Sequence, residues 1–280
     1  MSTAGALWRS SHPGPTTVVT SLAVALGWSA ALDPARLALL ALAVFAGQLS
    51  VGISNDAIDA PRDRAAARRD KPIARGDVTT GVAWGAALAA LGAALLLSAL
   101  LGWGMLGAHA LALGSAWAYN AGMKSTVASI VPFLVSFGIF PSLATLSGPM
   151  PVVAPAWAWL AGAALGAAVH LTNVLPDLEQ DAATGVRGLP HRWGPRTSAA
   201  VAAIAVVGGG LAALVGPSGG DASAIPPFSW ACFAAVVIVA AATLAMAVLR
   251  PPSRALFRLV MLAALLLAVQ LVAAGRVLAS

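Results

Sequence analysis

Apolar residues occur along the chain in long runs that are bounded by Gly, Pro or charged residues. A helix needs about 20 residues to cross a hydrocarbon layer of about 30 Å, and most of the runs approach this length. The pattern predicts nine membrane-spanning helices, near residues 16–32, 36–54, 79–101, 103–119, 127–146, 152–175, 198–215, 228–249 and 255–278. The connections are too short for a soluble domain. We therefore expect one all-α membrane domain over residues 1–280, a bundle of about nine transmembrane helices.

Composition agrees with a chain that is solvated mainly by lipid. Of its 280 residues, 59% are hydrophobic and only 9% are charged, whereas soluble domains carry about 25% charged residues. The net charge of +6 comes from basic residues in the loops between apolar runs, so anionic lipid and phosphate are expected partners and nucleic acid is not. Cys232 is the single cysteine, which excludes an intrachain disulfide.

The distribution of Lys and Arg predicts an orientation. If the N-terminus and the loops after the second, fourth, sixth and eighth helices share one side, only Arg36 and Arg276 of the 16 basic residues lie on the other side. The positive-inside rule then places the N-terminus and the charged loops in the cytoplasm. The preference for Arg over Lys and the abundance of Ala are typical of GC-rich bacterial genomes, which predicts a bacterial cytoplasmic membrane.

Acidic residues are concentrated in two segments, which follow the second and sixth predicted helices. Of the 10 Asp and Glu residues, only Asp33 and Asp221 lie elsewhere. The others are Asp56, Asp59, Asp63, Asp70 and Asp77 in the first segment, and Asp177, Glu179 and Asp181 in the second. Both segments emerge on the same predicted side, so they could contribute to one site.

The spacing within each segment favours a metal site. Four-residue steps separate Asn55, Asp59 and Asp63, and also Asn173, Asp177 and Asp181. A helical backbone puts each trio on one face, where like charges destabilise the helix unless a cation offsets them. Oxygen ligands suit magnesium or calcium, and magnesium commonly shares its coordination with a substrate phosphate. Two facing stripes would therefore suit a metal-bridged diphosphate.

A simpler alternative is that these carboxylates only neutralise nearby basic side chains in solvated loops. The repetition of the pattern, each time with Asn in the first position and at the end of a span, favours the metal site. Pro61 and Pro176 are expected to interrupt or end the helices beside the trios. The freed backbone groups could bind ligand, or the prolines could be simple helix stops.

Cations that could hold a diphosphate lie near both segments. Lys124 is the only charged residue between Asp77 and Asp177, and it either extends to the membrane surface or binds an anion. Arginine side chains such as Arg68 and Arg69 suit phosphate oxygens, although lipid headgroups attract them too. The four histidines, His12, His109, His170 and His191, show no metal-ligand spacing, and we expect packing or hydrogen-bonding roles for them.

Four motifs, in order, give the chain a family resemblance. They are Asn-Asp-Ala-Ile-Asp-Ala-Pro-Arg-Asp at 55–63, Asp-Lys-Pro-Ile-Ala-Arg-Gly at 70–76, Tyr-Asn-Ala-Gly-Met-Lys at 119–124, and the second acidic motif at 173–190. With these motifs the chain resembles the UbiA superfamily of intramembrane prenyltransferases over nearly its whole length. The resemblance implies nine helices around a central cavity that opens sideways to the bilayer, capped by both acidic motifs.

The resemblance also implies an activity and a set of site residues. It implies Mg²⁺-dependent transfer of a prenyl group from an isoprenoid diphosphate to an aromatic, quinone-precursor or lipid acceptor. Magnesium would be held by Asn55, Asp59, Asp63, Asp177 and Asp181, the four aspartates being the catalytic residues. Arg68, Lys124, Asn55 and Asn173 would lie near the diphosphate. Lys71 stands where many relatives have Arg, and the sequence leaves open whether Arg68 or Arg69 faces the site.

Two other functions remain open at this level. A terpene cyclase on the same scaffold would capture the allylic cation with a double bond of its own substrate. An ion-coupled transporter would use membrane acids to bind a coupling ion, but here the acids lie at span ends. The acceptor, the prenyl chain length and the oligomeric state depend on features that the pattern does not encode.

Overall fold

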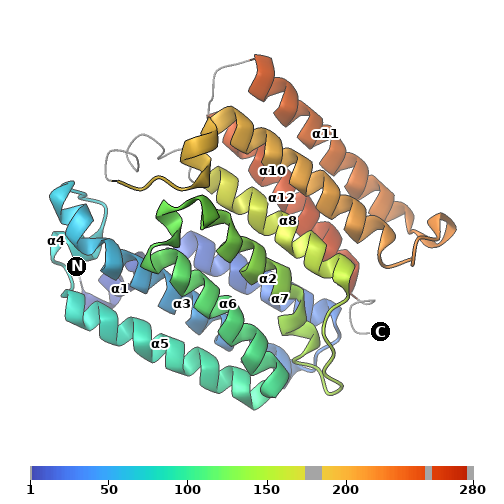
Figure 1. Ribbon diagram of the computed structural model, residues 1–280. Coiled ribbons are helices and arrows are strands. Elements are labelled where there is room, and N and C mark those ends of the chain that lie inside the picture. The colour runs from blue at the N-terminus through green and yellow to red at the C-terminus, as the bar shows by residue number, and fades with distance from the viewer. Residues whose placement is uncertain (1, 174–184, 250–253, 276–280) are drawn as a thin grey trace.

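The computed structural model describes residues 2–173, 185–249 and 254–275, which form helices and contain no β-strand (Figure 1). The α-helices are α1 (Thr3–Ser10), α2 (Pro13–Ser29), α3 (Pro34–Ala65), α4 (Pro72–Arg75), α5 (Thr80–Leu101), α6 (Trp103–Ala121), α7 (Val131–Thr145), α8 (Ala156–Asn173), α10 (Leu189–Val215), α11 (Pro227–Leu249) and α12 (Arg254–Ala273). Short 3-10 turns η1 (Met123–Ser125) and η2 (Val127–Ile130) join α6 to α7, and η3 (Ala222–Ala224) precedes α11. The all-α prediction is confirmed.

Each predicted apolar run coincides with one long helix of the described chain. Among the residues that the structure describes, five helical segments are long and apolar enough to cross a membrane: Pro34–Ala65, Thr80–Leu101, Val127–Thr145, Leu189–Val215 and Pro227–Leu249. The fold is therefore that of a membrane bundle. That nine helices cross the membrane stays a prediction.

Helix α3 is longer than the sequence predicted. Asp33 caps its start, because its Oδ1 accepts hydrogen bonds from the backbone N–H groups of Ala35 and Arg36. The helix then continues through Pro61 to Ala65, so the expectation that Pro61 ends or interrupts it is wrong. A proline removes only one backbone N–H, so the helix can continue past it. An ion pair between Asp59 and Arg62 at 3.0 Å spans this position.

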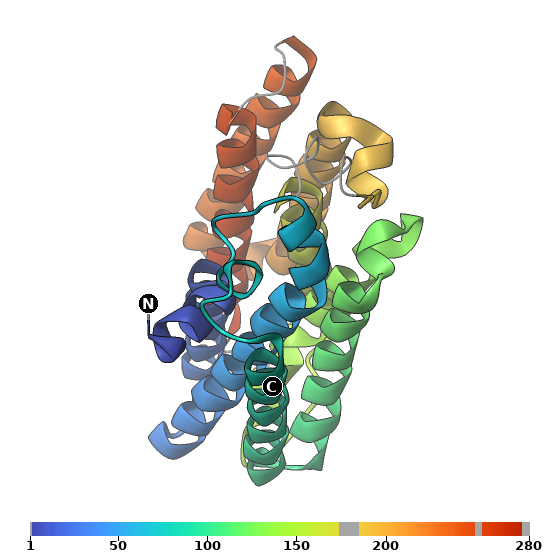
Figure 2. The ribbon, with the colours of Figure 1, turned by 90° about the vertical axis from the view of Figure 1, so that its left-hand side faces the viewer.

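Six helices form a closed ring. α2, α3, α6, α7, α8 and α12 each pack against the next, and α12 returns to α2. α5 covers α3 and α6 from outside, while α10 and α11 cover the α8 and α12 side (Figure 1). Figure 2 views the end of the bundle that carries α1 and α4. The segments that follow α3 and α6 reach this same end, so the ring presents its charged residues there.

The backbones of helices α7 and α8 are in direct contact. A Cβ atom on Gly162 would overlap the carbonyl oxygen of Phe137, and one on Gly166 would overlap that of Phe133. Small residues four apart let two membrane helices pack this closely. The position of α7, and of the phenylalanines it carries, is therefore fixed by α8.

The opposite end of the bundle is filled by apolar side chains. Leu26 of α2, Leu40 of α3, Met105 of α6 and Leu143 of α7 are completely or almost completely buried there. Their burial closes the ring at this end. Any space inside the ring can therefore open only toward the charged end or sideways.

Candidate active site

A cavity of about 420 Å³ lies inside the ring, within the size range of small-ligand sites. α2, α3, α6, α7 and α8 all contribute to its wall. Along α3 the lining changes from Val44 through Gln48 to Asp63, a rise of about 28 Å. The cavity thus has an apolar interior and a charged mouth, as an amphipathic ligand would require.

The first acidic motif forms one face of α3 and points into this cavity. Asn55, Asp59 and Asp63 all line it, whereas Asp56, one position off the stripe, does not. The four-residue spacing therefore places the three side chains together, as the sequence predicted. Their oxygen atoms are the donors that a hard divalent cation prefers.

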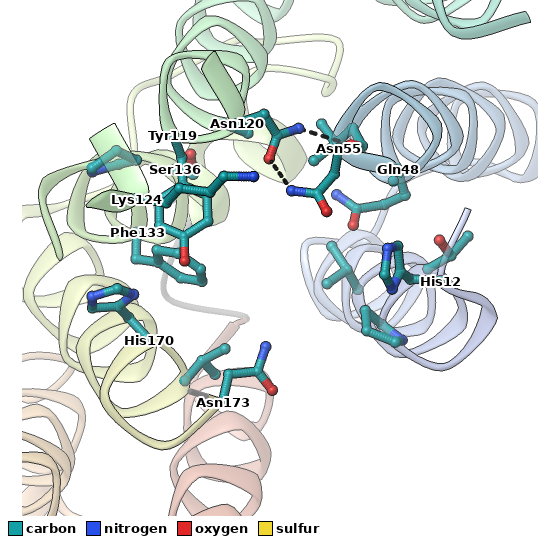
Figure 3. Close-up of a pocket in the computed structure, with 18 of the residues that line it drawn as sticks. His12, Gln48, Asn55, Tyr119, Asn120, Lys124, Phe133, Ser136, His170 and Asn173 are labelled. Carbon is teal, nitrogen blue, oxygen red and sulfur yellow. Dashed lines mark hydrogen bonds between the residues drawn. The ribbon is translucent and has the colours of Figure 1, made fainter. Parts of the chain in front are cut away.

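A hydrogen-bond network determines which end of the Asn55 amide faces the cavity (Figure 3). Asn120 of α6 donates from Nδ2 to the backbone carbonyl of Val51 at 2.9 Å and to Ser54 Oγ at 3.1 Å. Its Oδ1 must therefore accept, and it accepts from Asn55 Nδ2 at 3.0 Å. Asn55 consequently turns its own Oδ1 toward the cavity. Sequence reasoning missed this role of Asn120, although it lies within the Tyr-to-Lys motif.

Asp59 is held by two cations. Lys124 Nζ lies 2.6 and 2.7 Å from its two carboxylate oxygens, and Arg62 approaches Oδ2 at 3.0 Å. Both Lys124 and Arg62 line the cavity. Lys124 therefore points into the bundle, and of the two alternatives for this residue the structure favours anion binding over extension to the membrane surface.

Asp63 has far weaker partners. It is 3% exposed, and its one ion pair within the described chain is with Arg62 Nε at 3.9 Å. A buried carboxylate without close hydrogen-bond donors is costly. The residue therefore suits a further cation in the cavity.

A second cluster of charged side chains surrounds Asp56, next to the stripe of Asn55, Asp59 and Asp63 on α3. Asp56 is 2% exposed and accepts from Lys71 Nζ at 2.7 Å and contacts His12 Nε2 at 2.9 Å. This cluster ties the α1–α2 connection and the loop before α4 to α3. Lys71 is thus engaged with a carboxylate, and no spacing pattern indicated that His12 contacts Asp56.

The structure separates Arg68 from Arg69. Arg68 lines the cavity, while Arg69 is exposed and not part of its wall. Arg68 also donates from Nε and Nη2 to Asp70 at 2.9 and 2.8 Å. This hydrogen bonding lowers the pKa of Asp70 to about 2. Arg68 is therefore the guanidinium that faces the site.

The second acidic motif is described only in part. Asp177 and Asp181, with Pro176 and Glu179, lie outside the described residues, so their place in the site stays a prediction. Asn173, the last residue of α8, lines the cavity (Figure 3), and Gly188 lines it where the description resumes. The described residues at both ends of this motif therefore line the cavity.

The residues present fit magnesium. In the described part of the chain no three His, Cys, Asp or Glu side chains cluster as a complete metal cage. The cavity instead offers two carboxylates, Asp59 and Asp63, and the amide oxygen of Asn55. Magnesium is typically bound by one or two carboxylates together with substrate phosphates and water.

An aromatic wall on α6 and α7 faces the interior. Phe133 and Phe137 stack with centroids 6.3 Å apart, and Tyr119 meets Phe133 edge-on at 5.1 Å. Phe140 continues the row, and all four rings line the cavity. The spacing of the phenylalanines at i, i+4 and i+7 could have indicated this face from the sequence.

The chain belongs to the UbiA prenyltransferase family, whose model matches residues 15–266. The resemblance seen in the motifs is thereby confirmed, as are the assignments to the prenyltransferases and to a membrane-embedded fold. A comparison with curated protein sequences gave no match.

Solved structures share the fold across almost the whole chain. The apo form of a UbiA homolog from Aeropyrum pernix K1 has a TM-score of 0.71 at 18% identity, covering 90% of this chain and 95% of that one. A UbiA homolog from Archaeoglobus fulgidus bound to GPP and Mg²⁺ has a TM-score of 0.70 at 14% identity, covering 96% and 99%. A digeranylgeranylglyceryl phosphate synthase structure scores 0.70 at 15% identity, covering 98% of each chain.

Proposed function

We propose that this protein transfers the prenyl group of an isoprenoid diphosphate to an acceptor inside the membrane, in a magnesium-dependent reaction. The observation that carries the proposal is the oxygen stripe of Asn55, Asp59 and Asp63 beside Lys124 at the charged mouth of a cavity whose interior is mainly apolar. A diphosphate fits the mouth and an isoprenoid chain fits the interior. The GPP and Mg²⁺ bound to the Archaeoglobus fulgidus homolog support, by analogy, the pairing of a prenyl diphosphate with magnesium.

The proposed site residues fall into two groups, one that would bind magnesium and one that would bind the diphosphate. Asn55, Asp59 and Asp63 would hold magnesium, with Asp177 and Asp181 completing its protein ligands from the second motif. When bound, magnesium supplies positive charge against the charge that develops on the leaving diphosphate. Arg68 and Lys124 would bind the phosphate oxygens directly, and Asn173, which lines the same cavity, would contribute to this binding.

The reaction begins when the allylic C1–O bond breaks and its electron pair leaves with the diphosphate. Lys124 and Arg68 stabilise that charge in a site poorly screened by water, where preorganised cations are most effective. The ring faces of Tyr119, Phe133 and Phe137 suit the allylic cation and keep water away from it. An electron-rich acceptor carbon then forms the new bond and loses its proton to water.

A membrane terpene cyclase is the second candidate function, because the same aromatic wall would also shelter a cyclising cation. An ion-coupled transporter is disfavoured, since the cavity closes against the apolar core at its far end. In vivo, the proposed enzyme would act in the bacterial cytoplasmic membrane, with its charged mouth toward the cytoplasm.

The proposal is tested with the purified protein in detergent, magnesium, a panel of prenyl diphosphates and a panel of aromatic and lipid acceptors. Mass spectrometry should find a prenylated acceptor and released diphosphate, both lost when EDTA removes the metal. Cyclic products formed without any acceptor would instead identify a cyclase. Intact substrates under all conditions would refute both functions.

A further inference from the structure

Polar side chains also occur deep in the cavity, away from the diphosphate site. Gln48 of α3, His109 of α6 and Ser136 of α7 line its interior. Gln48 precedes Asp59, and His109 precedes Asn120, by roughly three helical turns, or about 16 Å along each helix. These groups therefore lie well below the charged mouth and are not needed to hold a diphosphate there.

The hydrogen bonds around His109 determine where its proton lies. Ser98 Oγ donates to the backbone carbonyl of Ala94 at 2.7 Å, which uses the only hydrogen of the hydroxyl. Ser98 must therefore accept from His109 Nδ1, which lies 2.7 Å away. Nδ1 carries the proton, and Nε2 is left with a lone pair.

That lone pair has no donor within the described chain. His109 is 3% exposed, and α3 makes room for its ring through Gly47, where a Cβ atom would lie 2.9 Å from Nε2. An acceptor that is largely enclosed by protein and has no hydrogen-bond partner is energetically costly. A ligand that donates a hydrogen bond at this position would remove that cost.

Gln48 supplies the complementary groups. Its side-chain amide makes no hydrogen bond with the described residues, and Figure 3 shows it directed into the cavity beside Asn55. The amide offers two donor hydrogens and an acceptor oxygen. Ser136 already donates to the Ala112 carbonyl at 3.0 Å and can only accept. Together these side chains can both donate to and accept from one ligand group.

Charge restricts what that ligand can be. The Lys and Arg side chains that line the described cavity are Arg62, Arg68, Lys71 and Lys124. All four lie at the mouth. A carboxylate bound beside His109 would have no nearby cation, and burying an unpaired charge is costly. The interior therefore favours an uncharged polar group.

We propose that His109 and Gln48 form the acceptor subsite, and that the acceptor is an uncharged hydroxyarene. Its O–H donates to His109 Nε2 while its oxygen accepts from the Gln48 amide. This inference rests on the proposed prenyl transfer. As the donor C1–O bond breaks toward diphosphate, a ring carbon of the acceptor forms the C–C bond and its proton passes to water. The hydrogen bond to Nε2 increases electron density in the ring and holds it below C1.

A matched pair of probes tests the charge preference in the wild-type protein. 1,4-Dihydroxynaphthalene and 1,4-dihydroxy-2-naphthoate differ by one carboxylate, and each is offered with magnesium and the best prenyl diphosphate of the panel. We expect kcat/KM to be at least 10-fold higher for the uncharged probe. Equal use of the two probes, or preference for the carboxylate, would overturn the inference.

Two substitutions of one residue separate a binding role from a structural one. In His109→Gln, the longer side chain can place its amide oxygen near the position of Nε2. In His109→Asn, the shorter amide reaches only the position of Nδ1 and can keep only the hydrogen bond with Ser98. We expect the acceptor KM to rise at least 10-fold in His109→Asn and in Gln48→Met, and to change less than threefold in His109→Gln. The opposite order would assign His109 a purely structural role.

The donor half of the reaction keeps this test separate from the proposed function. The wild-type protein should release diphosphate from the prenyl donor in water, without acceptor. If the wild-type protein releases diphosphate but shows the reverse probe preference, only the acceptor subsite is wrong. If it never ionises a prenyl diphosphate, the proposed function fails and the subsite fails with it.

Discussion

Lys124 and Asp59 form a closed pair across the mouth of the cavity, with Nζ at 2.6 and 2.7 Å from the two carboxylate oxygens. Their side chains are only 10% and 12% exposed, so solvent screens this pair weakly. A diphosphate with its metal offers each partner a new counter-charge. Lys124 can therefore exchange the carboxylate for phosphate as the substrate binds.

Removing the Asp59 charge should abolish catalysis without unfolding the protein. We expect Asp59→Asn or Asp59→Ala to lower kcat/KM at least 100-fold, because the variant loses a metal ligand and the partner of Lys124. Asp177→Ala should have a similar effect. Asp221→Asn, at an exposed cap far along the chain, is the control and should leave turnover unchanged. Near-normal turnover of Asp59→Asn would contradict the metal assignment.

The two neighbouring arginines should differ in function. Arg68→Gln removes a cation from the cavity wall, so we expect the KM for the prenyl diphosphate to rise about 10-fold or more. Arg69→Gln changes an exposed side chain and should alter KM less than twofold. Steady-state kinetics at fixed magnesium measure both. Equal effects would mean that the guanidinium of Arg68 does not reach the phosphate.

Asn120 should act on magnesium through Asn55. Asn120→Leu frees the Asn55 amide to rotate, so we expect the magnesium concentration for half-maximal rate to rise about 10-fold. The control is Trp117→Phe, which also removes a hydrogen bond from α6 to α3, at Ser50, but away from the cavity. A matching rise in the control would show that helix packing, not amide orientation, is responsible.

The α7–α8 contact should depend on glycine. A methyl group at Gly166 meets the Phe133 carbonyl, so we expect Gly166→Ala to destabilise the protein by about 1–3 kcal/mol. Gly85→Ala, on the outer side of α5 with open space around it, should be neutral or slightly stabilising. Thermal unfolding in detergent compares the two. An unchanged melting temperature for Gly166→Ala would indicate that α7 can move away.

Local patterns in the sequence predict much of this molecule. Long apolar runs indicate each long helix but not the short helices α1 and α4. The four-residue step of Asn55, Asp59 and Asp63 places these side chains on one face because helical geometry is local. The Asp56 contacts with His12 and Lys71 are not local, so no spacing rule reveals them. Pro61 misled the prediction because it removes only one backbone hydrogen bond, a loss that the 32-residue helix α3 tolerates without ending.

Gln48 illustrates why a pattern can be present and still be overlooked. It lies two helical turns before Asn55 on the same face. A single amide in an apolar run is usually interpreted as a polar residue without a specific role. Only the convergence with His109 from α6 gives it a partner group for a ligand. Such convergence depends on the parallel course of α3 and α6, which the sequence does not state.

Because the glycines of α8 hold the backbone of α7 in place, the room available to an isoprenoid tail on that side cannot be enlarged by shifting the helix. On the α7 side, that room depends on the size of side chains such as Phe137 and Phe140, which line the cavity. In the proposed function, the side chains at these two positions would therefore limit the length of the prenyl chain. Single substitutions at these positions would change the accepted chain length without altering the charged mouth of the cavity.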